Sequence, residues 1–456
     1  MTRYTVAAIT FFFVAASCIV AQNAPDAADS TEAALSVRTL TADQAVELAL
    51  KNNIDVQVQA IETEQARREY AHSWNNVLPS INATGSGSES RLYQDADTDT
   101  LTLQAGVTAS LSLDTGLASK IKQLKSAYQA GKASYEDTVR ETESSVRKSF
   151  YNLLYLKEQL ESARTTRDSY QRQYDQTKAK ADRGVASQLD LLTAQVNLET
   201  AKPDVDSAEN TSLNGLVSFL NTIGMELEAG SRVELSGTLD YAESVQELDT
   251  TKIVDECVEK SPEVRALEDS LRTARYSRSS TAASLYFPSL TLGANAYPFS
   301  WQKEQVSGTD SKTPNWTVSL GLTLPLDSWL PGSSSRDTLA QLDDTIATYE
   351  LQLADKKKTV RTETVEKLKD IELSRKTLQA RKMNVELAQK SYEMTEDAYN
   401  RGTKDLLTLQ SSLDTLRSAQ LQLREEQYTL ISNVLDLETS LGLPSGSLFN
   451  TTADAE

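Results

Sequence analysis

The sequence is poor in the residues that many catalytic and metal sites need. It contains one histidine, His72, and two cysteines, of which Cys18 lies in an N-terminal apolar run and Cys257 lies outside it. The chain after that run therefore cannot form an internal disulfide, a zinc site built from several Cys and His ligands, or a pair of catalytic histidines. We expect folding to rest on burial alone, with no cofactor and no metal, and we interpret His72 and Cys257 as structural residues.

Positive charge is also scarce. The chain has 46 Lys and Arg against 65 Asp and Glu, a net charge of −19, and no basic block. Proteins that bind nucleic acid neutralise phosphates with basic residues, so no nucleic-acid binding is expected. No enzymatic function is expected either, because Gly131-Lys132, the nearest match to a phosphate-binding loop, lacks the earlier glycine of that motif.

Apolar runs that could cross a membrane as a helix are absent after residue 21. Arg3 precedes an apolar run from Thr5 to Val20, and the residues before position 22 are small or aliphatic, so residues 1–21 are predicted to be a signal peptide. Two alternatives stay open, a single membrane anchor and lipidation at Cys18. The chain is thus expected to be exported, either as a soluble periplasmic protein or as one that crosses a membrane only as β-strands.

The chain contains an internal duplication, which four landmarks reveal by recurring in the same order. Asp55-Val56 recurs as Glu263-Val264, Leu78-Pro79-Ser80-Ile81 as Phe287-Pro288-Ser289-Leu290, Leu113-Asp114 as Leu326-Asp327, and Arg183-Gly184 as Arg401-Gly402. The offset drifts from 208 to 218 residues, which indicates two copies of one unit with small insertions. The expected domains are a flexible N-terminal linker at 22–39, a first repeat at 40–245, a second repeat at 246–443 and a C-terminal tail at 444–456.

Each copy is expected to begin with short helices. The first of them has the spacing of a capping box at Thr41 to Gln44, and the next helix is expected at about 55–76, with a counterpart at about 263–285. These helices stop at Pro79 and Pro288, because proline ends a helix and forces an extended start of the following strand.

The segments after these prolines change to a period of two. Every odd-numbered residue from Leu101 to Leu113 is apolar, and the apolar residues from Trp316 to Leu326 alternate in the same way with Thr, Ser, Gly and Pro. Such strands have one apolar and one hydroxyl-rich face. We predict β-hairpins at about 80–113 and about 289–327, with loops at 94–100 and 302–314. Their length suits a membrane barrel, although packing on a soluble core stays open as an alternative.

The longest elements lack glycine and proline. Neither residue type occurs between Gly131 and Gly184, or between Gly332 and Gly402. Apolar residues from Leu339 to Leu353 recur at steps of three and four, which is the coiled-coil pattern.

Two helical hairpins are therefore predicted, at about 117–223 and about 335–440. Each turns at an Arg-Gly pair, where the glycine can take the left-handed conformation that ends a helix. Pro203 is expected to kink or interrupt the returning helix of the first hairpin.

The predicted fold class is an α+β membrane protein. Four strands per chain cannot close a barrel, and open strand edges are not tolerated in lipid. Two chains would give eight strands and a filled interior, whereas three would give twelve and an aqueous lumen. Three chains would also bring twelve long helices. We therefore expect an antiparallel α-helical coiled-coil barrel and a transmembrane β-barrel that trimerisation completes.

Several motifs together resemble the TolC family of outer-membrane efflux proteins. They are the Leu-Thr-x-x-Gln-Ala-Val-x-x-Ala-Leu opening at Leu40–Leu50, the Leu-Pro-Ser start of the strand, and the Tyr…Arg-Gly…Ser-x-x-Asp turn. The resemblance covers residues 40–443. It implies a homotrimer in the outer membrane, with its helical part in the periplasm, that serves efflux or type I secretion. It also implies docking onto an inner-membrane transporter, directly or through a periplasmic adaptor protein.

The resemblance also implies roles for the hairpin tips. The docking surface would consist of Arg183, Gly184, Val185 and Ser187 at the first tip and Arg401, Gly402 and Thr403 at the second. The closed gate would involve Asp190, Tyr399 and Lys404, with an Asp190–Lys404 ion pair across neighbouring helices as a latch. Thr408 and Ser411 stand where the family carries acidic residues, which puts a cation-selective constriction in doubt unless Asp405 or Asp414 substitutes. An ordinary solvated hairpin end is the alternative for each of these residues.

A second function stays open, that of a periplasmic coiled-coil adaptor or structural protein without a membrane barrel. Such an adaptor would normally have one helical hairpin flanked by β-rich modules. Two hairpins, each preceded by a pair of amphipathic strands, favour the exit duct.

Overall fold

The computed structural model describes residues 37–92, 98–225, 232–244, 250–304 and 310–449. The first half contains β1 (Val37–Leu40), α1 (Ala42–Asn52), α2 (Ile54–Ala71), η1 (Ser73–Val77), β2 (Ser80–Leu92), β3 (Thr98–Leu113), α3 (Leu117–Ala181) and α4 (Gln188–Thr222). The second half contains β4 (Arg232–Leu235), η2 (Leu239–Ser244), α5 (Thr250–Lys260), α6 (Pro262–Tyr286), β5 (Ser289–Glu304), β6 (Asp310–Lys312), β7 (Asn315–Thr323), η3 (Asp327–Trp329), α7 (Ser334–Asn400) and α8 (Leu406–Ser440).

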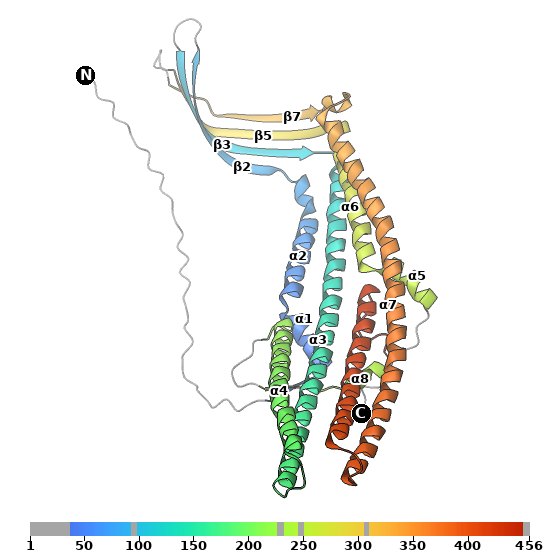
Figure 1. The fold of residues 1–456 in the computed structure, drawn as a ribbon. Helices are drawn as coiled ribbons and strands as arrows, with labels where there is room; N and C mark the ends of the chain where they lie inside the picture. Colours follow the sequence, from blue (N-terminus) through green and yellow to red (C-terminus); the bar gives the residue numbers. More distant parts are fainter. Residues whose placement is uncertain (1–36, 93–97, 226–231, 245–249, 305–309, 450–456) are drawn as a thin grey trace, which may run out of the picture.

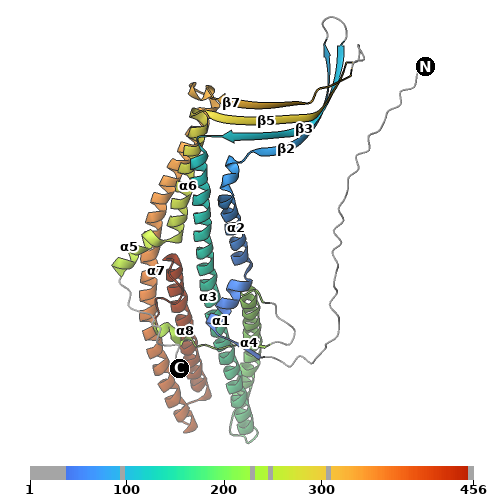
Figure 2. The same cartoon turned by 180° about the vertical axis from the view of Figure 1, so that it is seen from behind.

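The helices run roughly parallel to one long axis, and a curved sheet extends sideways from one end of them (Figures 1 and 2). The long α3 and α7 span nearly the whole helical body. Along each of them, one shorter helix lies near the sheet and another lies near the far end: α2 and α4 accompany α3, and α6 and α8 accompany α7. The duplication in the sequence therefore has a counterpart in the arrangement of the helices.

Local sequence signals set several helix ends. The capping box at α1 is confirmed, because the Gln44 backbone N–H donates to Thr41 Oγ1 and the Thr41 backbone N–H donates to Gln44 Oε1. The hairpin turns are confirmed as well. Gly184 and Gly402 have φ values of 73° and 76°, which a residue with a Cβ adopts only with strain.

The expectation that Pro203 interrupts the returning helix is wrong. α4 continues from Gln188 through Pro203 to Thr222. Ala201 and Val205, on either side of the proline, are buried. Packing of this apolar face against the neighbouring helix outweighs the one backbone hydrogen bond that proline cannot donate.

The expected loop at 302–314 is also partly wrong. β5 extends to Glu304, and β6 occupies part of the stretch that was expected to be a loop. In the first hairpin, β3 starts at Thr98, earlier than expected. Both strands extend beyond the alternating segments because a ladder to a neighbouring strand stabilises them.

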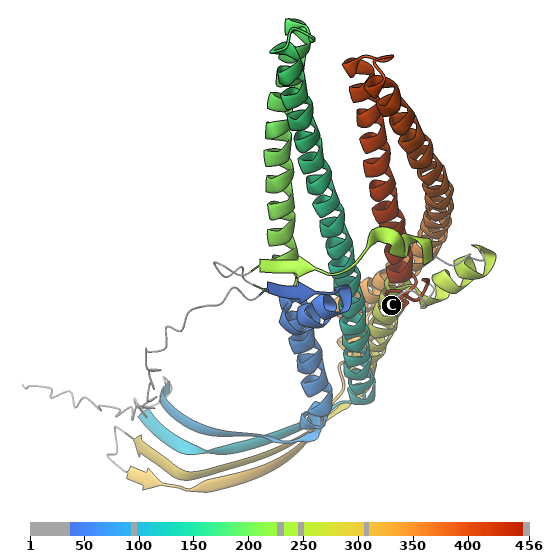
Figure 3. The same ribbon diagram turned by 90° about the horizontal axis from the view of Figure 1, so that it is seen from below.

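The sheet is antiparallel throughout, in the order β2-β3-β5, with β6 and β7 both pairing along the remaining edge of β5. Its register aligns the apolar residues of all strands on one face: Ile81 lies opposite Ala109, Leu111 opposite Leu292, and Leu292 opposite Leu320. Leu320 is 70% exposed in the single chain. The other face carries hydroxyl groups and amides, and Figure 3 shows the curvature of the sheet.

A β-bulge explains why the alternation in β5 is weak in the sequence. The register shifts between Ala105 and Val107, so that β5 has one extra residue near Tyr297. Phe299 is thereby paired with Ala105 and returns to the apolar face. Gly106 is required here, because a Cβ at that position would lie 2.2 Å from the Ala296 carbonyl oxygen.

The hydrophobic core lies at mid-height of the helical body. Phe150 of α3, Phe219 of α4 and Ile431 of α8 are almost fully buried in it. Cys257 and Ala49 are both completely buried in the same cluster, which confirms the interpretation of Cys257 as a small core residue. Burial raises the pKa of its thiol. None of the helices in the described part of the chain is both long and apolar enough to cross a membrane.

Candidate gate at the hairpin tips and the seam between the hairpins

The two helical hairpins, α3–α4 and α7–α8, end side by side at the pole opposite the sheet (Figure 3). Within each hairpin the helices bury apolar residues such as Leu198 of α4 and Leu413 of α8. Between the hairpins, α3 packs against α8. This places the two tips and the α3–α8 contact in one region, where the predicted gate residues lie.

At the first tip, Ser187 caps α4. Its hydroxyl accepts from the Asp190 backbone N–H at 3.1 Å, and it donates to Asp190 Oδ2 at 2.7 Å. The Ser187 backbone N–H donates to the same carboxylate oxygen. Asp190 therefore completes a capping box, a local role that the sequence analysis did not assign to it. Arg183 and Val185 are exposed at this tip.

At the second tip, Asp405 caps α8. Its carboxylate accepts from the Thr408 backbone N–H at 2.9 Å and from the Thr408 hydroxyl. These hydrogen bonds hold the pKa of the Asp405 carboxyl below its usual value. Thr403 donates to the Ala398 carbonyl oxygen, and exposed Arg401 pairs with a carboxylate of its own helix. Within the described part of a single chain, no ion pair joins Lys404 to Asp190.

Tyr399 makes a contact between the two hairpins that sequence reasoning missed. Lys180, in the last turn of α3, donates to the Tyr399 hydroxyl at 3.2 Å, and its Nζ lies 4.9 Å from the ring centroid. An exposed cation–π contact of this kind is worth about 0.5–1 kcal/mol. It is therefore a weak bridge between the two tips.

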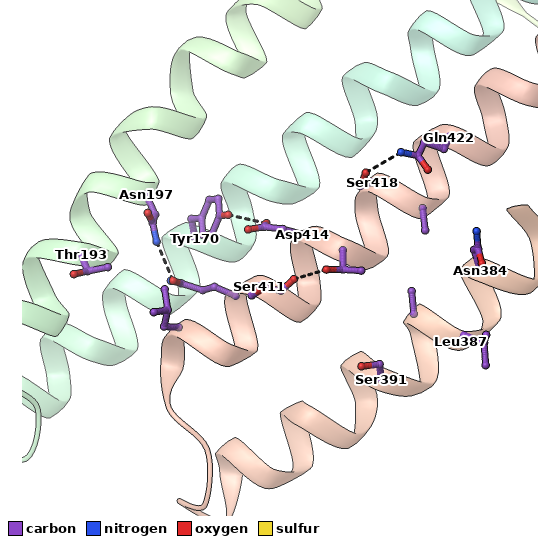
Figure 4. Close-up of a pocket in the computed structure, with 15 residues that line it drawn as sticks. Tyr170, Thr193, Asn197, Asn384, Leu387, Ser391, Ser411, Asp414, Ser418 and Gln422 are labelled. Atoms are coloured by element: carbon purple, nitrogen blue, oxygen red, sulfur yellow. Dashed lines mark hydrogen bonds between the residues drawn. The ribbon is translucent and has the colours of Figure 1, made fainter.

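Further from the tips, α3 and α8 are joined by hydrogen bonds, which we call the polar seam (Figure 4). Its members are Thr165, Ser169, Tyr170 and Gln173 of α3 and Gln410, Asp414 and Arg417 of α8. Gln410 donates to Gln173 at 2.8 Å and accepts from Asn197 of α4 at 3.0 Å. It thereby links three helices.

The polar seam also contains partly buried ionisable groups. The Tyr170 hydroxyl donates to Asp414 at 2.8 Å, and burial, with Asp414 as the second cause, raises the pKa of Tyr170 to about 12. Arg417 is 9% exposed and donates to the Thr165 carbonyl oxygen and the Ser169 hydroxyl. Burial lowers the pKa of Arg417, and its Nη1 has no partner among the described atoms. No local sequence pattern predicts these hydrogen bonds between α3 and α8, because their partners are about 240 to 250 residues apart.

A groove of about 850 Å³ lies beside the polar seam and is lined by α3, α4, α7 and α8. Ser411, one of the predicted constriction residues, lines it together with Asp414, Asn197 and Ser391. The lining is mostly neutral and polar. In the described part of the chain, no group of three His, Cys, Asp or Glu side chains is placed to hold a metal ion.

Comparison with known proteins gives the family. The family described as "Outer membrane efflux protein" matches residues 45–223 and 253–443, which is most of both copies. The probable efflux pump outer membrane protein TtgC of Pseudomonas putida is 24% identical, over 90% of this chain and 84% of its own length. Outer membrane protein TolC of Vibrio cholerae is 24% identical, over 84% and 86%.

Solved structures agree with this fold. The outer membrane channel CmeC of Campylobacter jejuni matches with a TM-score of 0.74 at 17% identity, over 91% of this chain and 87% of that one. The duplicated sequence, the paired helical hairpins and the family match lead to one assignment. The chain belongs to the outer membrane efflux protein family and acts in the outer membrane as an exit duct for efflux.

Proposed function

We propose that three copies of this chain close into one duct that crosses the outer membrane as a β-barrel and the periplasm as a helical tunnel. The observation that carries the proposal is the sheet. Among the described strands, β2 and β7 each have one edge without a partner strand, and one face of the sheet is apolar. Unpaired edges and an exposed apolar face are stable in lipid only when other copies complete the sheet.

The strand directions support closure by identical copies. β2, β3, β5 and β7 alternate in direction, so β7 of one copy is antiparallel to β2 of the next. Three copies supply twelve strand positions, enough for an aqueous lumen lined by the hydroxyl-rich face. The apolar face would contact lipid. The helices of three copies would continue this tube as a coiled-coil barrel.

The partners follow from the same arrangement. The duct carries efflux or type I secretion cargo that an inner-membrane transporter delivers, with a periplasmic adaptor that docks at the exposed hairpin tips. The names of TtgC and of related proteins, which refer to efflux pumps, support this reading. The duct itself is not an enzyme and needs no cofactor. Thr408 and Ser411 leave the constriction without an acidic ring, so weak cation selectivity is expected.

The oligomeric state in the membrane tests this proposal. We expect the detergent-extracted protein to migrate as a heat-resistant trimer and to fractionate with the outer membrane. A soluble periplasmic monomer would overturn the duct and favour the alternative, a coiled-coil adaptor or structural protein without a barrel.

The gate is proposed to close through Asp190, Tyr399 and Lys404, with Asp190 paired to Lys404 of a neighbouring chain. Exposed ion pairs contribute about 0.2–1 kcal/mol, which suits a latch that opens reversibly. We expect Lys404→Glu to raise the conductance of the closed duct in planar bilayers. Asp190→Lys should do the same, but it also removes the capping box of α4. Ser187→Ala removes that cap while keeping the Asp190 carboxylate, so it serves as the control and should leave the current unchanged. Unchanged currents in both charge reversals would eliminate the latch.

A further inference from the structure

A basic segment lies at the end of α3 that joins the sheet. Residues 115–135 contain four lysines and no Asp or Glu, in a chain whose net charge is −19. Lys122 and Lys125 are exposed, and neither forms an ion pair with another residue of the described ranges. Lys132, further along the helix, has Glu136 at 3.9 Å. We call Lys122, Lys125 and Lys132 the basic patch, and its first two lysines are not neutralised within the chain.

The second copy of the duplicated unit has no such patch. Its long helix α7 corresponds to α3 at an offset of 218, the offset of the two Arg-Gly turns, and buried Phe150 thereby matches buried Leu368. At this offset Lys125 corresponds to Asp343. Asp343 pairs with Arg278 of α6, so the charge at this position of α7 is neutralised.

A second position shows the same difference between the copies. Lys132 corresponds to Glu350 of α7, which pairs with Arg275 of α6 at 2.8 Å. In the first copy, α2 has Arg67 in the place of Arg275, at the offset of 208. Two cations therefore replace the ion pair, and Arg67 takes its carboxylate partner, Glu64, from its own helix. The excess of positive charge belongs to the first copy, so a trimer carries three basic patches.

The basic patch lies on the outer side of the helical wall. Spacings of three and seven residues place its lysines on one face of α3. Phe150 follows Lys132 by eighteen residues, or about five full turns, so it lies on the same face. That face is covered at mid-height by the segment between β4 and η2, since a Cβ at Gly237 would lie 3.1 Å from Phe150 Cε1, and this segment runs on across the helices (Figure 3). Such a segment on the lumen side of three copies would obstruct the duct.

Exposed aromatic side chains mark the level of the membrane surface. Trp74 of η1, Phe287 at the end of α6 and Trp329 of η3 lie where the helices meet the sheet, and they are 53%, 57% and 62% exposed. Aromatic girdles lie at the interfaces of membrane barrels. Lys122 and Lys125 follow the first residue of α3 by five and eight residues, about 8 and 12 Å along the helix. The polar layer of each leaflet is about 5–8 Å thick, and long lysine side chains extend towards such a layer.

We propose that the basic patch binds the phosphate groups of anionic phospholipids in the periplasmic leaflet of the outer membrane. The inference rests on the proposed trimeric duct and adds a lipid site to it. A phospholipid suits the patch better than free phosphate does, because the apolar face of the sheet continues beyond the aromatic side chains and can contact the acyl chains. Each lysine near an anionic lipid surface strengthens binding about fivefold. Lipids held at three patches would fix the depth of the duct in the membrane.

Quenching of tryptophan fluorescence by brominated lipids tests the proposal. The chain has four tryptophans, and Trp301→Phe combined with Trp316→Phe leaves Trp74 and Trp329 as reporters where the helices meet the sheet. The trimer is reconstituted in phosphatidylcholine vesicles in which a rising fraction of the lipid is brominated phosphatidylglycerol or, in parallel, brominated phosphatidylcholine. The two quenching curves give the relative affinity for the anionic lipid. We expect phosphatidylglycerol to be preferred at least fivefold, the effect of one lysine.

Lys122→Gln combined with Lys125→Gln should lower this preference to less than about twofold, because both unneutralised charges of the patch are removed. The matched control is Lys120→Gln combined with Lys157→Gln, which removes the same charge from exposed lysines of α3. Lys120 lies about 160° around the helix from Lys122, and Lys157 lies 40 residues from the start of α3, or about 60 Å. The control should keep the preference.

The outcomes separate this inference from the proposed duct. A trimer that enters the vesicles but has no preference for phosphatidylglycerol would overturn the lipid site alone. The same conclusion would follow if the preference survived in the Lys122 and Lys125 variant, or if it fell equally in the control. A protein that stays monomeric and does not enter the vesicles would overturn the proposed duct as well.

Discussion

Replacing Leu320 with arginine is expected to prevent assembly in the outer membrane. Leu320 lies on β7, in the apolar face, opposite Leu292 of β5. An arginine on the lipid face of a barrel costs about 2–4 kcal/mol at the bilayer centre. Three copies carry the substitution into one barrel, so the total is about 6–12 kcal/mol, comparable to the whole stability of a domain. We expect the heat-resistant trimer to disappear and the outer-membrane fraction to fall at least tenfold.

Ser319→Arg provides a control on the same strand. Ser319 is next to Leu320 and lies on the hydroxyl-rich face, opposite Gly293. An arginine there would face the aqueous lumen, so assembly should be retained while conductance changes. Equal amounts of Leu320→Arg and unmodified protein in the outer membrane would contradict the orientation of the sheet. It would also favour the soluble alternative, in which an exposed arginine is harmless.

Much of this architecture could be predicted from the sequence because its signals are local and periodic. The absence of Gly and Pro before Gly184 and Gly402 predicted long helices, and α3 and α7 end at the residues expected. Alternation in β3 predicted a two-faced strand, and the register confirms it. Periodicity and turn chemistry act over a few residues, so a single sequence reveals them.

The rest depended on contacts between distant residues. The β-bulge near Tyr297 shifts the phase of the apolar–polar alternation within β5, so no single period of two runs along the whole strand. The bulge is defined by the pairing of β5 with β3, which lies far away in the sequence. One missed contact is local: Asp190 forms a capping box with Ser187, three residues away, whereas the sequence analysis assigned Asp190 only to the latch, which stays a prediction. The residues of the polar seam look like an ordinary solvated helix face until α8 is packed on α3. Tertiary packing selects such pairs, and no local propensity predicts them.

Arg417→Glu is expected to open the polar seam. Arg417 is buried and donates hydrogen bonds to the Thr165 carbonyl oxygen and the Ser169 hydroxyl. Hydrogen bonds from a charged group contribute about 1.5–3 kcal/mol each, and a glutamate would also face the Thr165 oxygen and lie near Asp414. A loss of about 1.4 kcal/mol changes an equilibrium tenfold. The current through the closed duct in planar bilayers should therefore rise at least tenfold.

Two variants separate this effect from loss of packing and from net charge. Arg417→Met keeps most of the side-chain volume but, like Arg417→Glu, removes the hydrogen bonds to Thr165 and Ser169, so the current should rise, though less than with the added negative charge. Arg375→Glu makes the same charge change at an exposed site on α7 and should leave the current unchanged. If Arg417→Glu conducts no better than Arg375→Glu, the hydrogen bonds of α3 and α8 do not hold the wall closed.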